Sequence, residues 1–210
     1  MNRLILLRHG QSQWNLENRF TGWKDVPLTN KGIQEAINAG KLMKKHNVLI
    51  DLIFCSVLQR AVETARLALL QMNLKYLWNE SNELIMKTEK SLNERNYGDL
   101  VGLNKKETAK KFGKEQVQIW RRSFDVPPPG GESLKNVVER VEPYFFNIIE
   151  PELKKQKNIL IAAHGNSLRA MLICIGIYKP GEISKIEIPT GQPYVFYYEK
   201  NNLINSEYLV

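Results

Sequence analysis

Short, mostly apolar runs alternate along this chain with longer segments in which apolar residues recur at helical spacing. Three runs of strand length are residues 4–7 (LILL), 51–56 (DLIFCS) and 158–163 (NILIAA). Continuous apolar runs of this length are typical of strands that are buried on both faces of a parallel sheet. A fourth run, near 194–198, is predicted to be the last strand and to end the core.

Amphipathic helices are predicted between these strands. Thr29 is a candidate N-cap for the first long helix, because a hydroxyl there can accept a hydrogen bond from a free backbone N–H. Residues 58–72 show a second helical pattern, Ser133 opens a third, and a fourth is expected to begin at Ser167. Strands that alternate with helices in this way indicate an α/β fold with a mainly parallel sheet.

The middle of the chain, 81–131, is polar and irregular. It contains a helical segment that ends near Arg122, followed by the break PPPGG at 127–131. We interpret this break as a turn inside one domain, because the chain contains no repeat, low-complexity tract or linker. A single catalytic domain over residues 1–210 is therefore expected, which is an ordinary length for one domain.

Composition and charge narrow the possible functions only a little. No apolar stretch is long enough for a signal peptide or a membrane span, so we expect a cytoplasmic protein with no membrane partner. Cys55 and Cys174 lie in apolar runs without metal-ligand spacing and are expected to be buried free thiols. The net charge is +8, but the lysines are scattered and no aromatic residues are interleaved with them, so no nucleic-acid partner is predicted.

Two of the three histidines directly follow predicted buried strands. His9 comes after the first of these strands and His164 after the third, and each is followed by glycine. Ligands of open α/β sheets bind beyond the carboxyl ends of the strands, where Arg8 and Arg60 can also reach. A neutral imidazole is a competent acceptor for a phosphoryl group, and arginine captures phosphate oxygens in a bidentate manner. With no GxxxxGK[ST] motif and no acidic metal cluster in the sequence, the arginines are expected to stabilise the charge, and no metal is predicted.

Longer motifs carry a family resemblance. The segments LLRHGQSQWN, RFTGW, SVLQRAVET, LNERNYGDLVGLNK, WRRSF, PPGGES, AAHGNSLRA and IPTGQP occur in this order over nearly the whole chain. Together they resemble the cofactor-dependent phosphoglycerate mutases, within the histidine phosphatase superfamily. The RHG triplet alone indicates only the superfamily, whereas NERNYG, WRR and HGNS point to the mutase branch. The resemblance implies a phosphoglycerate mutase-like fold, a three-layer α/β/α sandwich, and a homodimer or homotetramer.

The resemblance also implies a reaction and roles for the matched residues. The enzyme would interconvert 3-phosphoglycerate and 2-phosphoglycerate through 2,3-bisphosphoglycerate, which also primes it as the cofactor, without a metal. His9 would become phosphorylated, with His164, Arg8 and Arg60 around the transferring group. Glu94 would be the general acid/base, and nearby phosphate charge would raise its pKa. The residues implied in substrate binding are Ser12, Asn15, Thr21, Gly22, Arg95, Tyr97, Lys105, Arg121, Arg122, Gly165 and Asn166.

A histidine phosphatase acting on a phosphorylated metabolite is the nearest alternative. Its first half-reaction would be the same, with water in place of the substrate hydroxyl as the second acceptor. NERNYG, Lys105 and the pair Arg121 and Arg122 favour the mutase, because a simple phosphatase need not retain and reorient a bisphosphate. A catalytically inert binding protein is disfavoured, since every polar residue needed for the cycle is present.

Overall fold

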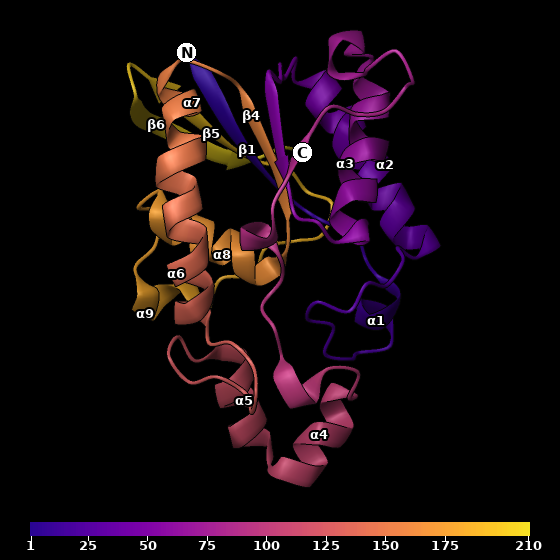
Figure 1. The fold of residues 1–210 in the computed structure, drawn as a ribbon, viewed down its shortest axis with the longest axis vertical. Helices are drawn as coiled ribbons and strands as arrows, with labels where there is room; N and C mark the ends of the chain where they lie inside the picture. Colours follow the sequence, from indigo (N-terminus) through magenta and orange to yellow (C-terminus); the bar gives the residue numbers. More distant parts are fainter.

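The computed structural model describes residues 1–210 and is built around one six-stranded sheet (Figure 1). The strands are β1 Asn2–Arg8, β2 Leu52–Cys55, β3 Lys87–Thr88, β4 Ile159–Ala163, β5 Tyr194–Glu199 and β6 Asn202–Tyr208. Their order in the sheet is β3-β2-β4-β1-β5-β6. The pairs β3–β2, β2–β4 and β4–β1 are parallel, whereas β5 is antiparallel to β1 and to β6. The predicted mainly parallel sheet is confirmed.

Helices connect the strands and cover both faces of the sheet. The α-helices are α1 Gln13–Leu16, α2 Asn30–Lys45, α3 Gln59–Met72, α4 Lys105–Phe112, α5 Lys114–Arg122, α6 Leu134–Tyr144, α7 Glu150–Lys154, α8 Gly165–Cys174 and α9 Pro180–Ile183. The shorter helical turns are η1 Lys75–Leu77, η2 Lys90–Leu92, η3 Gly98–Leu100 and η4 Phe145–Ile149, the last of them π-helical. None of these helices is long and apolar enough to cross a membrane.

The apolar run at residues 4–7, in the middle of β1, follows from its position between two cores. Leu4 and Leu6 belong to a core that contains residues of α6, α7 and α8. Ile5 and Leu7 point to the other face and belong to a second core, with residues of α2 and α3. Because successive residues of a strand face opposite sides, only a strand covered on both faces needs to be apolar throughout. The predicted three-layer α/β/α sandwich is therefore confirmed.

Hydroxyl caps mark helix starts correctly in two of three predicted cases. Thr29 and Ser133 are the N-caps of α2 and α6, and each side chain accepts a hydrogen bond from a backbone N–H three residues on. The predicted start at Ser167 is wrong, because α8 begins at Gly165 with His164 as its N-cap. Ser167 lies at the third helical position, and its hydroxyl reaches back to accept a hydrogen bond from the His164 N–H at 3.1 Å.

Three further expectations need correction. The strand near 194–198 does not end the sheet, because β5 turns back into β6, which forms one edge of the sheet. β6 is mostly polar and partly exposed, and it therefore carries no apolar run that would predict it. The polar middle contains two helices instead of one, since Gly113 adopts a φ of 90° and separates α4 from α5. Cys55 is a buried free thiol as expected, whereas Cys174 is only partly buried.

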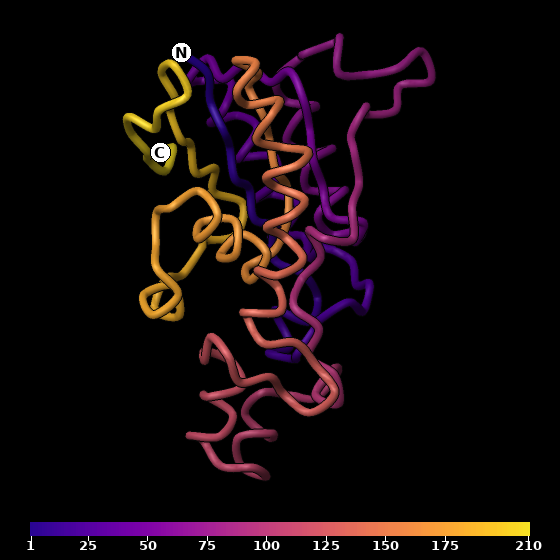
Figure 2. Tube along the Cα trace, turned by 60° about the vertical axis from the view of Figure 1, so that its left-hand side comes forward, coloured from indigo at the N-terminus to yellow at the C-terminus, as the bar shows by residue number.

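The segment that carries η3, α4 and α5 projects from the rest of the molecule. Figures 1 and 2 show it beyond the carboxyl ends of β1 and β4, apart from the layers that sandwich the sheet. A small apolar cluster of Leu100, Val117 and Phe20 packs it against the loop that follows α1. The space between this projection and the sheet contains the candidate site.

Candidate active site

His9 and His164 meet because their strands are neighbours. β1 and β4 pair in parallel with Arg8 opposite Ala163, so the residues that follow the two strands emerge side by side. The His9 N–H donates a hydrogen bond to the Ala163 carbonyl at 3.0 Å. The two imidazole rings lie edge to face, with centroids 4.9 Å apart. Both side chains are buried, His9 being 2% and His164 0% exposed.

The surroundings of His9 select its neutral form and one tautomer. Nδ1 lies 2.7 Å from the Gly10 carbonyl oxygen, which can only accept, so Nδ1 carries the proton and Nε2 keeps a free lone pair. Burial, followed by the positive charges of His164, Arg60 and Arg8, lowers the pKa of His9 well below its ordinary value. The ring is therefore uncharged near neutral pH, with Nε2 available as a nucleophile.

Close backbone packing holds the loop that carries His9. A Cβ added to Gly10 would lie 2.2 Å from the carbonyl oxygen of Gly32, in the first turn of α2. The Gly10 N–H also donates a hydrogen bond to the Thr64 hydroxyl on α3 at 3.1 Å. The loop is thus fixed against two helices at once, which leaves the His9 ring little freedom to shift.

A hydrogen bond with the Ser56 hydroxyl orients the His164 ring. Its Nε2 lies 2.8 Å from the Ser56 Oγ, and Ser56 donates its own hydroxyl proton to Asn93 Oδ1 at 2.8 Å. Ser56 must therefore accept from His164, which places a proton on Nε2. Nδ1 is buried without a partner. Burial, then the charges of Arg60, Arg8 and Arg140, lowers the pKa of His164 well below its ordinary value.

Arg8 and Arg60 are tied down by main-chain carbonyls. Arg60 is 1% exposed and donates to the carbonyls of Gly22 at 2.8 Å and Lys24 at 3.0 Å. Arg8 donates to the Ile188 carbonyl at 2.6 Å. The Nε atoms of both arginines are buried without a partner, so each guanidinium keeps a donor for an anion. Burial lowers the pKa of Arg60 to about 10, which still leaves it charged at neutral pH.

Glu94 is held at the edge of this cluster. Its Oε1 accepts hydrogen bonds from the Arg95 N–H at 2.8 Å and from the Asn166 backbone and side-chain amides at 3.1 and 2.9 Å. Burial raises the pKa of Glu94, but these hydrogen bonds and the charges of Arg60 and Arg8 outweigh it, and the net shift is downward. The protein's own groups thus favour the ionised carboxylate. The rise in the pKa of Glu94 that is expected from the charge of a bound phosphate group stays a prediction.

Arg140 supports the segment that carries Glu94. From α6 it donates to the main-chain carbonyls of Ser91 at 2.7 Å and of Asn93 and Glu94 at 3.1 Å. Its guanidinium also forms an ion pair with Glu132 at 2.8 Å. Arg140 does not line the site, but it fixes the backbone on which Glu94 and the Ser56 partner Asn93 stand.

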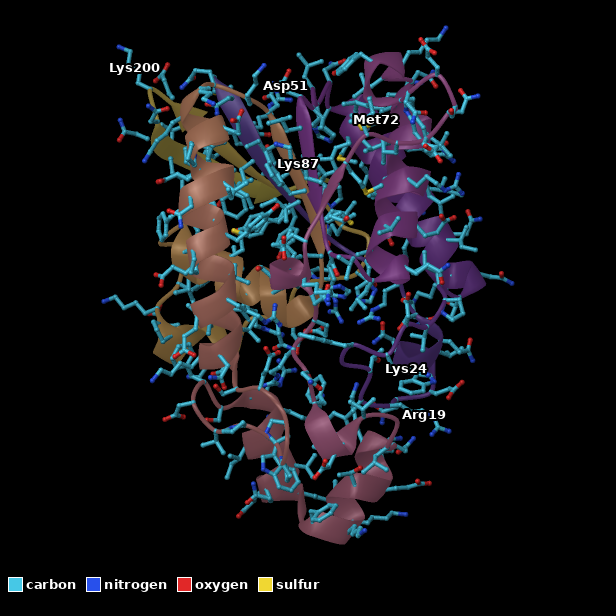
Figure 3. All side chains as sticks on the ribbon, viewed as in Figure 1. Arg19, Lys24, Asp51, Met72, Lys87 and Lys200 are labelled. Carbon is cyan, nitrogen blue, oxygen red and sulfur yellow. The ribbon has the colours of Figure 1, made fainter.

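A strongly cationic cleft joins these groups. It is lined by Arg8, His9, Asn15, Arg19, Thr21, Arg60, Glu94, Tyr97, Lys105, Arg121, Arg122, Gly165, Asn166, Arg169 and Glu187. Seven of these side chains are arginine or lysine, against two carboxylates. Such a wall suits a small ligand with several negative charges, because burying an anion without partners is very costly. Arg19 and Lys24 lie below the sheet near α1, whereas Asp51 and Lys200 lie at the top of the molecule (Figure 3).

Four of the predicted site residues do not line the cleft, and three of them support residues that do. Ser12 caps α1 and exchanges hydrogen bonds with Asn15. The Gly22 carbonyl holds Arg60. Arg95 is buried and donates to the Tyr97 hydroxyl at 3.2 Å and to the Arg121 carbonyl at 2.8 Å. His164 lies against His9.

Three lining residues were missed by the sequence analysis: Arg19, Arg169 and Glu187. Arg169 could have been found, because it follows Asn166 by three positions on α8 and so shares its face of the helix. Arg19 stands directly before the FTGW motif, which is a weaker signal. Glu187 lies in the irregular segment between α9 and β5, and nothing in its sequence surroundings predicts its position. No group of three or more potential metal-ligating side chains occurs in residues 1–210.

The chain matches known proteins over nearly its whole length. Residues 4–207 match the histidine phosphatase superfamily (branch 1). A protein of Bartonella henselae named 2,3-bisphosphoglycerate-dependent phosphoglycerate mutase is 47% identical over 99% of this chain and 97% of its own length. A protein of Protochlamydia amoebophila with the same name is 48% identical over 99% of this chain and all of its own. Among solved structures, the α-ribazole phosphatase of Shigella flexneri superimposes with a TM-score of 0.78 at 25% identity, covering 99% of this chain and 95% of that one.

Proposed function

The chain belongs to the histidine phosphatase superfamily, and we propose that within it the protein acts as a 2,3-bisphosphoglycerate-dependent phosphoglycerate mutase. It is an isomerase that interconverts 3-phosphoglycerate and 2-phosphoglycerate. Relatives of that name match this chain over nearly its full length at 45–48% identity. The observation that carries the proposal is the neutral His9 ring, with Nε2 free, beside His164 in a cleft of seven cations.

The residues present fit a bisphosphorylated glycerate. The Nε atoms of Arg8 and Arg60 and the Nδ1 of His164 are buried polar atoms without protein partners, as expected of groups that meet a phosphoryl group. Lys105, Arg121 and the other cations of the cleft would hold the carboxylate and the second phosphate. 2,3-Bisphosphoglycerate would supply the phosphoryl group that primes His9.

In the proposed cycle, Nε2 of His9 attacks phosphorus, and the bond from phosphorus to the glycerate oxygen breaks. Glu94 delivers a proton to that oxygen. In the reverse direction Glu94 takes the proton of a substrate hydroxyl, and that oxygen displaces His9 from phosphorus. Two such transfers, to one hydroxyl and from the other, convert 3-phosphoglycerate to 2-phosphoglycerate. Arg8, Arg60 and protonated His164 stabilise the charge on the transferring oxygens.

His164 needs a second proton to perform this role. Its Nε2–H already bonds to Ser56, and Nδ1 can donate to a phosphoryl oxygen only when it is protonated as well. Its buried surroundings disfavour that charge. A phosphoryl dianion next to the ring would favour it, so proton uptake by His164 would accompany binding of the phosphorylated ligand.

The defining experiment measures 2-phosphoglycerate formed from 3-phosphoglycerate, with and without added 2,3-bisphosphoglycerate. Isomerisation that depends on the bisphosphate is the expected result. Rapid release of inorganic phosphate without isomerisation would instead identify the protein as a phosphatase. Transient labelling with ³²P-bisphosphoglycerate, followed by mapping of the labelled residue, would test whether His9 is the acceptor.

We further infer a single catalytic domain over residues 1–210 that works in the cytoplasm as a homodimer or homotetramer. Its partners would be small phosphoglycerates, not nucleic acid or membranes. The full-length match to relatives named for a phosphoglycerate reaction supports this inference. Light scattering of the purified protein would determine the oligomeric state.

A further inference from the structure

One of the two carboxylates in the cleft lies on cations that the substrate would need. Glu187, in the segment between α9 and β5, pairs through Oε1 with Arg122 and through Oε2 with the Arg169 Nη2 at 3.4 Å. All three residues line the cleft. The guanidiniums are sheltered, with side chains 26% and 9% exposed, whereas the Glu187 side chain is 65% exposed.

Glu187 differs in this respect from Glu94, the other carboxylate. Three hydrogen bonds from Arg95 and Asn166 hold Glu94 in place. The two guanidiniums are the only hydrogen-bond partners of the Glu187 side chain. The Glu187 side chain can therefore turn toward solvent and give up only its hydrogen bonds with Arg122 and Arg169.

The backbone around Glu187 would stay in place during such a turn. The Ile186 carbonyl accepts a hydrogen bond from Arg169 Nε at 2.8 Å, and the Ile188 carbonyl accepts from Arg8 Nη1 at 2.6 Å. The segment is anchored on both sides of Glu187, so only the side chain needs to move. Partial burial raises the pKa of Glu187, but its bonds and charge interactions with Arg122 and Arg169 outweigh that effect, so the carboxylate is charged at neutral pH.

We propose that the Glu187 carboxylate is an internal competitor, which occupies the anion subsite of Arg122 and Arg169 until a carboxylate or phosphate group of the ligand displaces it. A carboxylate on these guanidiniums makes the same charge-assisted hydrogen bonds that an incoming anionic group would make. The inference rests on the proposed function for the identity of the ligand, a phosphoglycerate. Glu187 would therefore lower the affinity of the cleft for its ligand.

A positioning role for Glu187 predicts the opposite sign. If the carboxylate served to hold Arg122 in its binding geometry, removing the charge would weaken the binding of anions. The direction of the change in affinity therefore separates the two roles.

The test is calorimetric titration of Glu187→Gln with inorganic phosphate and with 3-phosphoglycerate. Exposed ion pairs contribute modestly, so we expect Kd to fall about two- to tenfold for both probes. Glu199→Gln is the matched control: it removes the same charge from an exposed glutamate at the end of β5 and should leave Kd unchanged. In an Arg122→Ala background the gain from Glu187→Gln should shrink, because the shared cation is gone.

An unchanged or increased Kd in Glu187→Gln would overturn the inference, as would an equal gain in the Arg122→Ala background. The titrations measure binding without turnover. A wild-type protein that binds inorganic phosphate but does not isomerise 3-phosphoglycerate would contradict the proposed function, while the phosphate series would still decide the role of Glu187.

Discussion

The two halves of the cleft are built in different ways. In the inner half, Arg8, His9 and Arg60 stand at or just after a strand end or in the first turn of a helix, with His164 against His9. Main-chain groups and Ser56 hold these side chains. In the outer half, Lys105, Arg121 and Arg122 stand on α4 and α5, in the projection that a small apolar cluster attaches to the loop after α1. These outer side chains are only partly buried.

This difference separates positioning from recognition. Phosphoryl transfer depends on the placement of the reacting atoms, which a packed sheet supplies. Binding a polyanion calls for several cations, which long side chains on an appended helical segment can supply. Changes in the inner half should therefore affect rates, and changes in the outer half should affect affinities.

The largest effect is expected from His9→Ala. Removing the nucleophile should lower kcat by about 10⁴-fold or more and abolish acid-labile labelling by ³²P-bisphosphoglycerate. The fold should persist, because His9 stands on a loop. His46→Ala is the control, since His46 is exposed and remote from the cleft, and it should retain both activity and label. A labelled His9→Ala protein would show that another residue is the acceptor.

Glu94→Gln tests the proposed acid/base residue at the edge of the inner half. The amide oxygen can still accept from Arg95 and Asn166, so the geometry should survive, but the side chain can no longer take a proton from a hydroxyl. We expect transfer from His9 to the substrate to slow by about 10²- to 10⁴-fold, and initial phosphorylation of His9 to slow less. Quenched-flow measurement of each half-reaction would check this. Equal losses in both would argue against an acid/base role.

Arg121→Ala should act on affinity. Loss of a charge-assisted hydrogen bond to an anion is expected to raise KM about 10- to 100-fold, with kcat changed far less. The Arg121 carbonyl that supports Arg95 is retained in the variant. Steady-state kinetics of Arg121→Ala should be compared with those of Lys110→Ala, which removes a charge from the exposed face of α4. The comparison separates the loss of a direct contact with the ligand from a general loss of positive charge. A drop confined to kcat would contradict the expectation that the outer half of the cleft sets affinity.

Ser56→Ala should give the smallest change, but a diagnostic one. His164 loses the acceptor for its Nε2–H, which stabilises its protonated form, so the pKa of His164 should fall further. We expect kcat to drop about tenfold, and the limb of the pH–rate profile that reports protonated His164 to move to lower pH. Ser123→Ala, which removes a hydroxyl from the residue just after α5, should leave the profile unmoved. An unshifted profile in Ser56→Ala would contradict the positioning role of Ser56.

Most of the inner half could be predicted from sequence, because apolar runs locate strands and the residues after parallel strands gather at one edge. The meeting of His9 and His164 follows directly from that pattern. The edge strand β6 could not be found this way, because it faces solvent and has no apolar run. Nor could Glu187 be found, since its place depends on how an irregular segment passes Arg8 and Arg169. The start of α8 was misassigned because a serine at the third helical position resembles a cap.

Arg140 has a consequence for how this enzyme could be altered. It stands on α6, outside the cleft, yet it supports the backbone of Glu94 and Asn93. A change at Arg140 would disturb the proposed proton donor Glu94 and the hydrogen bond between Ser56 and Asn93 together, although Arg140 does not line the cleft. A mutant library for this protein should therefore leave this arginine untouched, even where it diversifies residues outside the cleft.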